Sequence, residues 1–160
     1  MPEEIERKFL LKDDRWRGQV ERSLDMAQGY LGNSQQCSIR IRVSGEDANL
    51  NIKSATLGIH RQEYDYAIPV AEAREMLDTL ADKPLIEKTR HMVRYGEHTW
   101  EIDEFYGDNA GLIVAEIELG SADEAFEQPP WLGADVSDDP RYYNVCLVSQ
   151  PFNAWPENVS

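Results

Sequence analysis

The sequence predicts an α+β protein that is mainly antiparallel β, a closed eight-stranded barrel with a charged interior and a few helices packed outside. Three observations predict this fold. Segments of alternating apolar and polar residues recur along the chain, turns rather than long crossovers connect most of them, and the charged residues of each segment share one face. Successive side chains of a strand point to opposite faces, so such alternation is typical of strands. No linker divides the chain, and one domain is expected over residues 1–160.

The composition limits the kind of protein this is. With 160 residues, 41% of them hydrophobic, the chain is long enough for a substantial core. Its 30 Asp and Glu against 16 Lys and Arg give a net charge of -14, which argues against a nucleic-acid partner. No segment has the pattern of a signal peptide or a spanning helix, so we expect no membrane partner and a cytoplasmic location. Cys37 and Cys146 have no metal-ligand spacing, and we expect buried free thiols.

The strands can be followed in chain order. The first begins with the alternating segment EEIERKF, in which Ile5 and Phe9 alternate with charged residues. Later segments such as CSIRIRV repeat the pattern and end at turn residues. We therefore expect eight strands, at residues 2–11, 26–31, 37–43, 48–55, 60–69, 85–95, 98–107 and 111–120.

Three helices are expected to cover the outside of the barrel. Acidic residues open the segment 13–21, where they suit the positive end of the helix dipole. The segment 70–82 places its apolar residues on one helical face. A capping-box pattern opens the segment 121–127. A final helix is expected to begin near Asp139-Pro140, because proline favours the first helical position.

The charged residues of the strands occur as like-signed pairs on one face. A solvated sheet face explains any single pair. However, side chains two residues apart lie within about 7 Å, and a surface that serves only solubility intersperses the two signs. We therefore expect this face to line the inside of the barrel. The basic pairs are Arg40 with Arg42 and Lys88 with Arg90, and the acidic pairs are Glu4 with Glu6, Glu101 with Asp103 and Glu116 with Glu118.

Such an interior suits a divalent cation together with a condensed phosphate. Carboxylates are hard oxygen ligands that favour Mg²⁺ or Mn²⁺. Lys and Arg bind phosphate oxygens, Arg by bidentate hydrogen bonds. The chain has no Gly-rich phosphate loop and no GxSxG motif, and its 3 histidines are not in HExxH spacing. Side chains of the barrel would therefore have to bind the phosphate.

The segment Glu4-Ile5-Glu6-Arg7-Lys8 matches the pattern E-x-E-x-K, and further charged residues follow it in order. On these residues the chain resembles the CYTH domain family, the triphosphate tunnel metalloenzymes, and looks like a short stand-alone bacterial member. The resemblance covers essentially the whole chain and implies an eight-stranded tunnel that binds triphosphates with divalent metal. The later matching residues are Arg40-Ile41-Arg42, Lys53, Glu63, Lys88-Thr89-Arg90, Asp103 and Glu116-Ile117-Glu118.

The resemblance also implies residue roles. Glu63 and Asp103 could instead serve only as ion-pair partners. Glu101 is left out of the implied site residues, because the family pattern does not call for it. The implied metal ligands are Glu4, Glu6, Asp103, Glu116 and Glu118, with Glu63 as a further candidate or a water-positioning group. The implied triphosphate-binding residues are Lys8, Arg40, Arg42, Lys53, Lys88 and Arg90, and the implied catalytic residues are Lys8, Arg40, Lys88 and Glu63.

The expected reaction is the hydrolysis of a phosphoanhydride in inorganic triphosphate with Mg²⁺ or Mn²⁺, nucleoside triphosphates being poorer candidates. A class IV adenylate cyclase and a thiamine triphosphatase are alternatives within the same family. A polyphosphate- or nucleotide-binding module without catalysis is a further alternative, and an acidic β-protein for protein contacts is another. The sequence leaves the oligomeric state open, and a homodimer is one of the states it allows.

Overall fold

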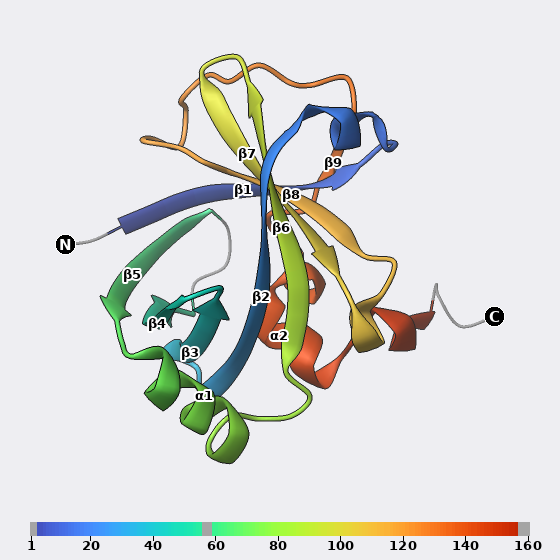
Figure 1. Ribbon diagram of the computed structural model, residues 1–160. Coiled ribbons are helices and arrows are strands. Elements are labelled where there is room, and N and C mark those ends of the chain that lie inside the picture. Colours follow the sequence, from blue (N-terminus) through green and yellow to red (C-terminus); the bar gives the residue numbers. More distant parts are fainter. Residues whose placement is uncertain (1–2, 56–58, 157–160) are drawn as a thin grey trace.

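The strands form one antiparallel sheet that closes into a barrel (Figure 1). The computed structural model describes residues 3–55 and 59–156, so Pro2 of the first expected strand lies outside the described residues. The sheet closes where β1 pairs with β5, with Glu3 opposite Gln62. The eight strands follow the order β5-β4-β3-β2-β6-β7-β8-β1, and β9 adds to the outer edge of β1. The predicted eight-stranded antiparallel barrel is therefore confirmed. The strands are β1 (Glu3–Leu11), β2 (Val20–Asn33), β3 (Cys37–Ser44), β4 (Asp47–Ser54), β5 (His60–Ala67), β6 (Ile86–Tyr95), β7 (His98–Phe105), β8 (Ile113–Glu118) and β9 (Leu132–Asp135).

The strand β2 begins earlier than predicted, and the helix expected over 13–21 is wrong. Only a 3-10 turn, η1 (Arg15–Gln19), occurs there, and the strand starts at Val20. Val20 lies opposite Val93 of β6, so pairing with a neighbour extends β2 through a segment that has no apolar alternation of its own. Trp16 of η1 is fully buried.

The short strand β9 was not predicted. It pairs with the end of β1, where Leu11 lies opposite Leu132. A Cβ atom at Gly133 would lie 2.8 Å from the carbonyl oxygen of Leu10, so the close approach of the two strands requires glycine. This contact is invisible in the sequence because its four residues show no alternation.

The helix predicted over 121–127 is also wrong. The carboxylate of Glu124 does not cap a helix, since its Oε1 accepts a hydrogen bond from the amide of Gly120 at 2.6 Å. Its Oε2 lies 2.6 Å from Nε2 of His98 on β7. Phe126 packs edge-on against Trp100, with ring centroids 5.8 Å apart. The segment is thus held against the barrel in an irregular conformation.

The outer faces of the strands carry the main hydrophobic core. Trp100 and Ile102 of β7 are fully buried there, and Trp16 and Trp131 pack over them. On the other side of the barrel, α1 (Val70–Thr79) packs Ala73 against β3 and β4 (Figure 1). This helix is the first part of the one predicted over 70–82.

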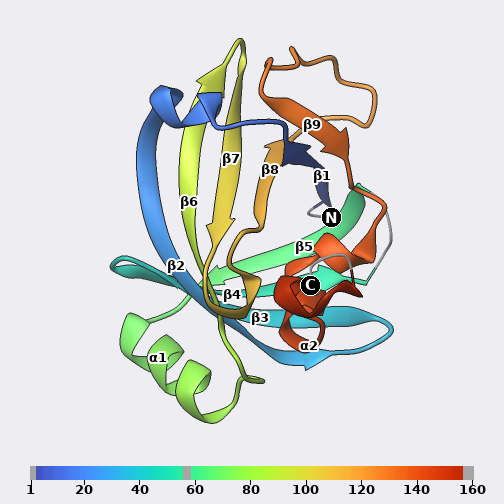
Figure 2. The same cartoon turned by 90° about the vertical axis from the view of Figure 1, so that its right-hand side faces the viewer.

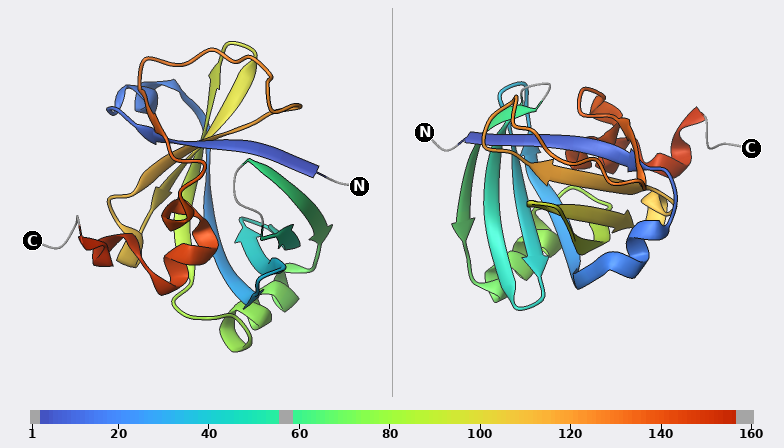
Figure 3. Two further views of the ribbon diagram at one scale, coloured as in Figure 1. Left: turned by 180° about the vertical axis from the view of Figure 1, so that it is seen from behind. Right: turned by 90° about the horizontal axis from the view of Figure 1, so that it is seen from above.

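The last helix, α2 (Asn144–Ser149), packs on the inner faces of strands at one end of the barrel. Leu147 contacts Ile86, Phe105 and Val114, which share strand faces with Lys88, Asp103 and Glu116. Figure 2 and Figure 3 show α2 at one end of the barrel, near the turn that joins β7 and β8. The helix therefore closes part of the barrel instead of covering its outside. The remaining elements are the 3-10 turns η2 (Gly107–Asn109), η3 (Pro140–Tyr142) and η4 (Phe152–Ala154).

The thiols of Cys37 and Cys146 are free and half-buried, so they are less buried than expected. Among the described residues, no helix has the length and apolar character needed to cross a membrane.

Candidate functional site

A polar cavity lies inside the barrel. Strands from every side and the start of α2 contribute to it, because the alternation of each strand points its charged residues inward. Most of the residues predicted to form the site line this cavity together. They are Glu4, Glu6, Lys8, Arg40, Arg42, Lys53, Glu63, Lys88, Arg90, Glu116 and Glu118. Glu118 is exposed, whereas Lys8 and Glu116 are buried.

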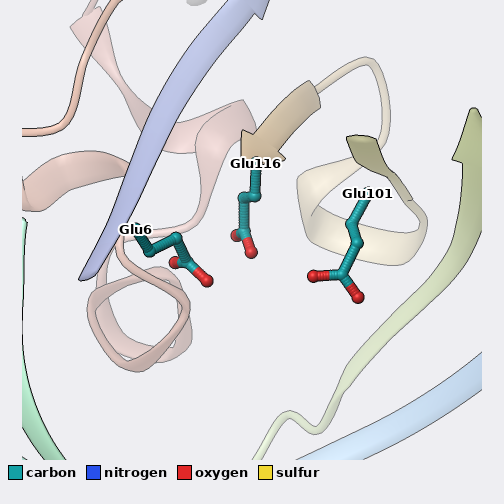
Figure 4. Close-up of side chains that lie close together, drawn as sticks. All are labelled: Glu6, Glu101 and Glu116. Carbon is teal, nitrogen blue, oxygen red and sulfur yellow. The ribbon is translucent and has the colours of Figure 1, made fainter. Parts of the chain in front are cut away.

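Three carboxylates gather at one side of the cavity (Figure 4). They are Glu6 of β1, Glu101 of β7 and Glu116 of β8, and one oxygen of each lies within 4.8 Å of the others. Register explains their proximity, since Glu101 lies directly opposite Glu116 on the neighbouring strand. Among the described residues, no ion pair is formed by Glu6. The trio thus offers oxygen ligands from three strands to one cation.

The three carboxylates differ in protonation. Burial, and then the charges of Glu116 and Glu4, raise the pKa of Glu6 to about 8. Burial also raises the pKa of Glu101, against the opposing charge of Arg90. Burial alone would raise the pKa of Glu116 as well, but Lys8 and Arg90 hold it well below its usual value. Without a cation, the raised pKa keeps Glu6 largely protonated near pH 7, and a bound cation would favour its charged form.

Two lysines form ion pairs on the walls of the cavity. Nζ of Lys8 lies 3.1 Å from Oε1 of Glu116, and Nζ of Lys53 lies 3.0 Å from Oε1 of Glu4. Burial, and then a hydrogen bond with Glu63, raise the pKa of Glu4. The same hydrogen bond lowers the pKa of Glu63. Glu63 also accepts a hydrogen bond from the amide of Asn51 at 2.8 Å.

Asp103 lies behind the cavity wall, between two cations. Its Oδ2 accepts hydrogen bonds from Nζ of Lys88 at 2.8 Å and from Nη2 of Arg90 at 2.9 Å. Its Oδ1 accepts one from Nε of Arg90 at 2.8 Å. Burial alone would raise the pKa of Asp103, but Arg90 and Lys88 lower it to about 2. Burial lowers the pKa of Lys88 to about 7. Both oxygens of Asp103 are therefore engaged by cations.

Three arginines in the cavity have no carboxylate partner among the described residues. Nε of Arg42 donates to Oε1 of Gln28 at 2.9 Å, and Nε of Arg40 is buried without a hydrogen-bond partner. Arg61 stacks over the ring of Tyr143, 4.3 Å from its centroid. Burial, and then the charge of Arg40, lower the pKa of Arg42 to about 9, so it stays charged at pH 7. These groups are available to an anion.

Some residues of the cavity were not assigned to the site from the sequence, although alternation had already placed one of them, Glu101, on the inward face. Glu101 shares the inner face of β7 with Asp103, so alternation alone was a sufficient signal for it. Arg61 likewise alternates with Glu63 on β5. Asn144 and Tyr143 precede or begin a helix, and nothing in their spacing indicates that they reach the interior.

The fold and the cavity define a class of protein, a closed antiparallel tunnel that suits a multiply charged anion together with a cation. The family model described as "CYTH domain" matches residues 2–143. The chain therefore belongs to the CYTH domain family, which confirms the resemblance seen in the sequence.

Similar proteins agree with this assignment. An inorganic triphosphatase of Acetivibrio thermocellus is 42% identical over 157 residues, which cover 98% of this chain and 100% of that protein. An inorganic triphosphatase of Nitrosomonas europaea is 35% identical over 149 residues, covering 91% of this chain and 96% of that protein. A crystal structure of an inorganic triphosphatase superposes with a TM-score of 0.65 at 34% identity, covering 91% of this chain and 93% of that chain.

Proposed function

We propose that this protein is an inorganic triphosphatase that hydrolyses a phosphoanhydride bond of tripolyphosphate with Mg²⁺ or Mn²⁺. One observation carries the proposal: a carboxylate trio within 4.8 Å lines the same cavity as Arg40 and Arg42, which have no carboxylate partner among the described residues. A condensed phosphate with its counter-cation satisfies both groups at once. The activity of the two curated relatives supports the same substrate.

Glu6, Glu101 and Glu116 fit a divalent cation best. Their donors are all carboxylate oxygens, which favour Mg²⁺ or Mn²⁺ over softer metals. When bound, such a cation neutralises phosphate oxygens and supplies Lewis-acid polarisation. Glu4 and Glu118 line the same cavity and stay candidate ligands. Asp103 is less suited to this role, because both of its oxygens bind Lys88 and Arg90.

The cations of the cavity suit binding of the phosphate chain. Arg40 and Arg42 have nitrogen donors that no carboxylate of the described residues occupies, and guanidinium groups bind phosphate in bidentate fashion. Lys8 and Lys53 contact carboxylates at about 3 Å, so substrate would share them with Glu116 and Glu4. Arg90 binds Asp103 and stands beside the trio, where it suits the oxygens nearest the cation.

Lys88 is the group we assign to the reacting bond. Its pKa of about 7 suits donation of a hydrogen bond or a proton to the leaving phosphate oxygen near neutral pH. Lys8 and Arg40 would stabilise negative charge that develops on the phosphoryl oxygens. Glu63, held by Asn51, is the carboxylate we assign to orienting the water nucleophile. Cytoplasmic location, the homodimer and a single domain over residues 1–160 stay predictions.

A substrate panel tests the proposed function. Purified protein is incubated with tripolyphosphate, pyrophosphate, ATP or thiamine triphosphate and with Mg²⁺ or Mn²⁺, and phosphate, pyrophosphate and cyclic AMP are measured. We expect fastest phosphate release from tripolyphosphate and its loss in EDTA. Cyclic AMP and pyrophosphate from ATP would indicate a cyclase, and binding of tripolyphosphate without phosphate release would indicate a binding module. Either result would contradict the proposal.

A further inference from the structure

The first residue of α2 reaches a cation of the cavity. Oδ1 of Asn144 accepts a hydrogen bond from Nζ of Lys88 at 2.8 Å. The same ammonium donates to Oδ2 of Asp103 at 2.8 Å. An ammonium group has three donors, so these two contacts leave one for a ligand in the cavity.

A second amide fixes the orientation of Asn144. Nε2 of Gln28 donates to the same Oδ1 at 3.2 Å, and Oε1 of Gln28 accepts from Nε of Arg42 at 2.9 Å. Because both neighbours donate to Oδ1, the amide of Asn144 must present its oxygen to Lys88. Gln28 is fully buried. The chain of contacts therefore joins two cations on different strands through α2.

Helix packing does not explain this contact. Leu147 supplies the buried apolar contact of α2 with the barrel. The side chain of Asn144 is not the cap of α2, which begins after Tyr143 without a side-chain cap bond. The oxygen is instead directed at a lysine whose long side chain has many rotamers and needs fixing before it can act.

We propose that Asn144 is a positioning residue that holds the ammonium of Lys88 toward the triphosphate. The inference rests on the proposed function and deepens it, because Lys88 is the group assigned to the leaving phosphate. In this arrangement Asp103 anchors the ammonium from behind the wall, Asn144 fixes it from the end of the barrel, and its third N–H points to substrate. The C-terminal helix is thus part of the site.

A double-mutant cycle tests the proposal, with tripolyphosphate and Mg²⁺ and with folding checked by circular dichroism. We expect Asn144→Ala to lower kcat about 10- to 100-fold, since a hydrogen bond to a charged group is lost, and to change KM less than about threefold. In the Lys88→Ala background, adding Asn144→Ala should lower the residual kcat by less than about threefold. The exposed residue at the end of α2 provides a matched control, and Ser149→Ala should keep the wild-type kcat.

Asn144→Asp keeps an oxygen acceptor of the same shape and guards against a folding defect of the alanine variant. It should retain kcat within about fivefold while raising KM, because the added charge repels the anion. Equal loss of kcat in Asn144→Asp and Asn144→Ala, or multiplicative effects of Asn144→Ala and Lys88→Ala, would overturn the proposal. These outcomes are read against an active wild-type protein. An inactive wild type would instead refute the proposed function.

Discussion

The two sides of the tunnel differ in how their cations are paired. On the side formed by β1, β6, β7 and β8, Lys8, Lys88 and Arg90 bind carboxylates, including the fully buried Asp103. On the side formed by β3, β4 and β5, Lys53 pairs with Glu4, but Arg40 and Arg61 have no carboxylate partner among the described residues. Carboxylates fix the cations of the first side, whereas most cations of the second side have no carboxylate partner within the part of the chain that the structure describes. We infer that the first side orders the reacting groups and the second side attracts the anion.

Asp103→Asn should destabilise the fold more than any other substitution considered below, because it disrupts the buried ion pairs of the first side. Two buried cations would lose their counter-charge, and breaking a buried ion pair typically costs about 3–5 kcal/mol. We expect the free energy of unfolding, measured by urea denaturation, to fall by that amount. Asp14→Asn is the matched control, because Asp14 forms an exposed pair with Arg17 at 3.5 Å and should cost less than about 1 kcal/mol. An equal loss of unfolding free energy in the two variants would mean that the buried ion pairs of Asp103 stabilise the fold no more than an exposed pair does.

Glu6→Gln tests whether the carboxylate trio holds the cation. The amide keeps the shape of the side chain but removes a charged ligand, so kcat/KM should fall about 100- to 1,000-fold and the Mg²⁺ needed for half-maximal rate should rise. Glu3 stands on the same strand but pairs with His60 on the exposed surface. Glu3→Gln should therefore keep activity within about twofold. Unchanged Mg²⁺ dependence in Glu6→Gln would remove Glu6 from the metal site.

Arg40→Ala and Lys53→Ala sharpen the comparison between free and paired cations. Arg40 forms no ion pair with a carboxylate in the described part of the chain, so its charge is available to the anion, and in Arg40→Ala KM for tripolyphosphate should rise about 10- to 100-fold. Loss of Lys53 also leaves Glu4, its partner at 3.0 Å, without its counter-charge. Adding Glu4→Gln to Lys53→Ala removes that negative charge and should recover part of the affinity for tripolyphosphate. A larger effect of Lys53→Ala than of Arg40→Ala, with no recovery in the double variant, would contradict the greater part in anion binding assigned to the cation without a carboxylate partner.

The pH dependence of stability tests the charge of the trio. The pKa of Glu6 is about 8 in the folded protein and 4.5 as the ordinary value. Its contribution to stability is therefore fully present below pH 4.5 and is lost as the pH rises toward 8. Without metal, the free energy of unfolding should fall by about 1.4 kcal/mol between pH 6 and 7 relative to Glu6→Gln. Urea titrations in EDTA at the two pH values measure this difference. The same change in the free energy of unfolding between pH 6 and 7 for both proteins would contradict it.

Much of the barrel could be predicted because alternation is a local property. The inward direction of Arg40, Arg42 and Lys88 follows from the period of two and from like-signed pairing. The start of β2 could not be predicted, since pairing of Val20 with β6 decides it. The capping-box pattern at 121–127 failed because Glu124 binds His98 across the chain instead.

The site was less accessible from sequence than the strands. Alternation places Glu101 on the inner face, but only the register of β7 against β8 brings it beside Glu116. The contact between Asn144 and Lys88 joins residues that are far apart in the chain, and no local pattern indicates it. Residue types and faces could therefore be predicted, whereas distances across the tunnel required the closed barrel.

A structure determined with Mn²⁺ and tripolyphosphate tests the central claim most directly. The anomalous signal of manganese locates the ion independently of the phosphate. We predict a peak in coordination distance of Glu6, Glu101 and Glu116, with the phosphate chain extending from it toward Arg40 and Arg42 inside the barrel. A peak away from the carboxylate trio, or tripolyphosphate bound outside the tunnel, would contradict the account.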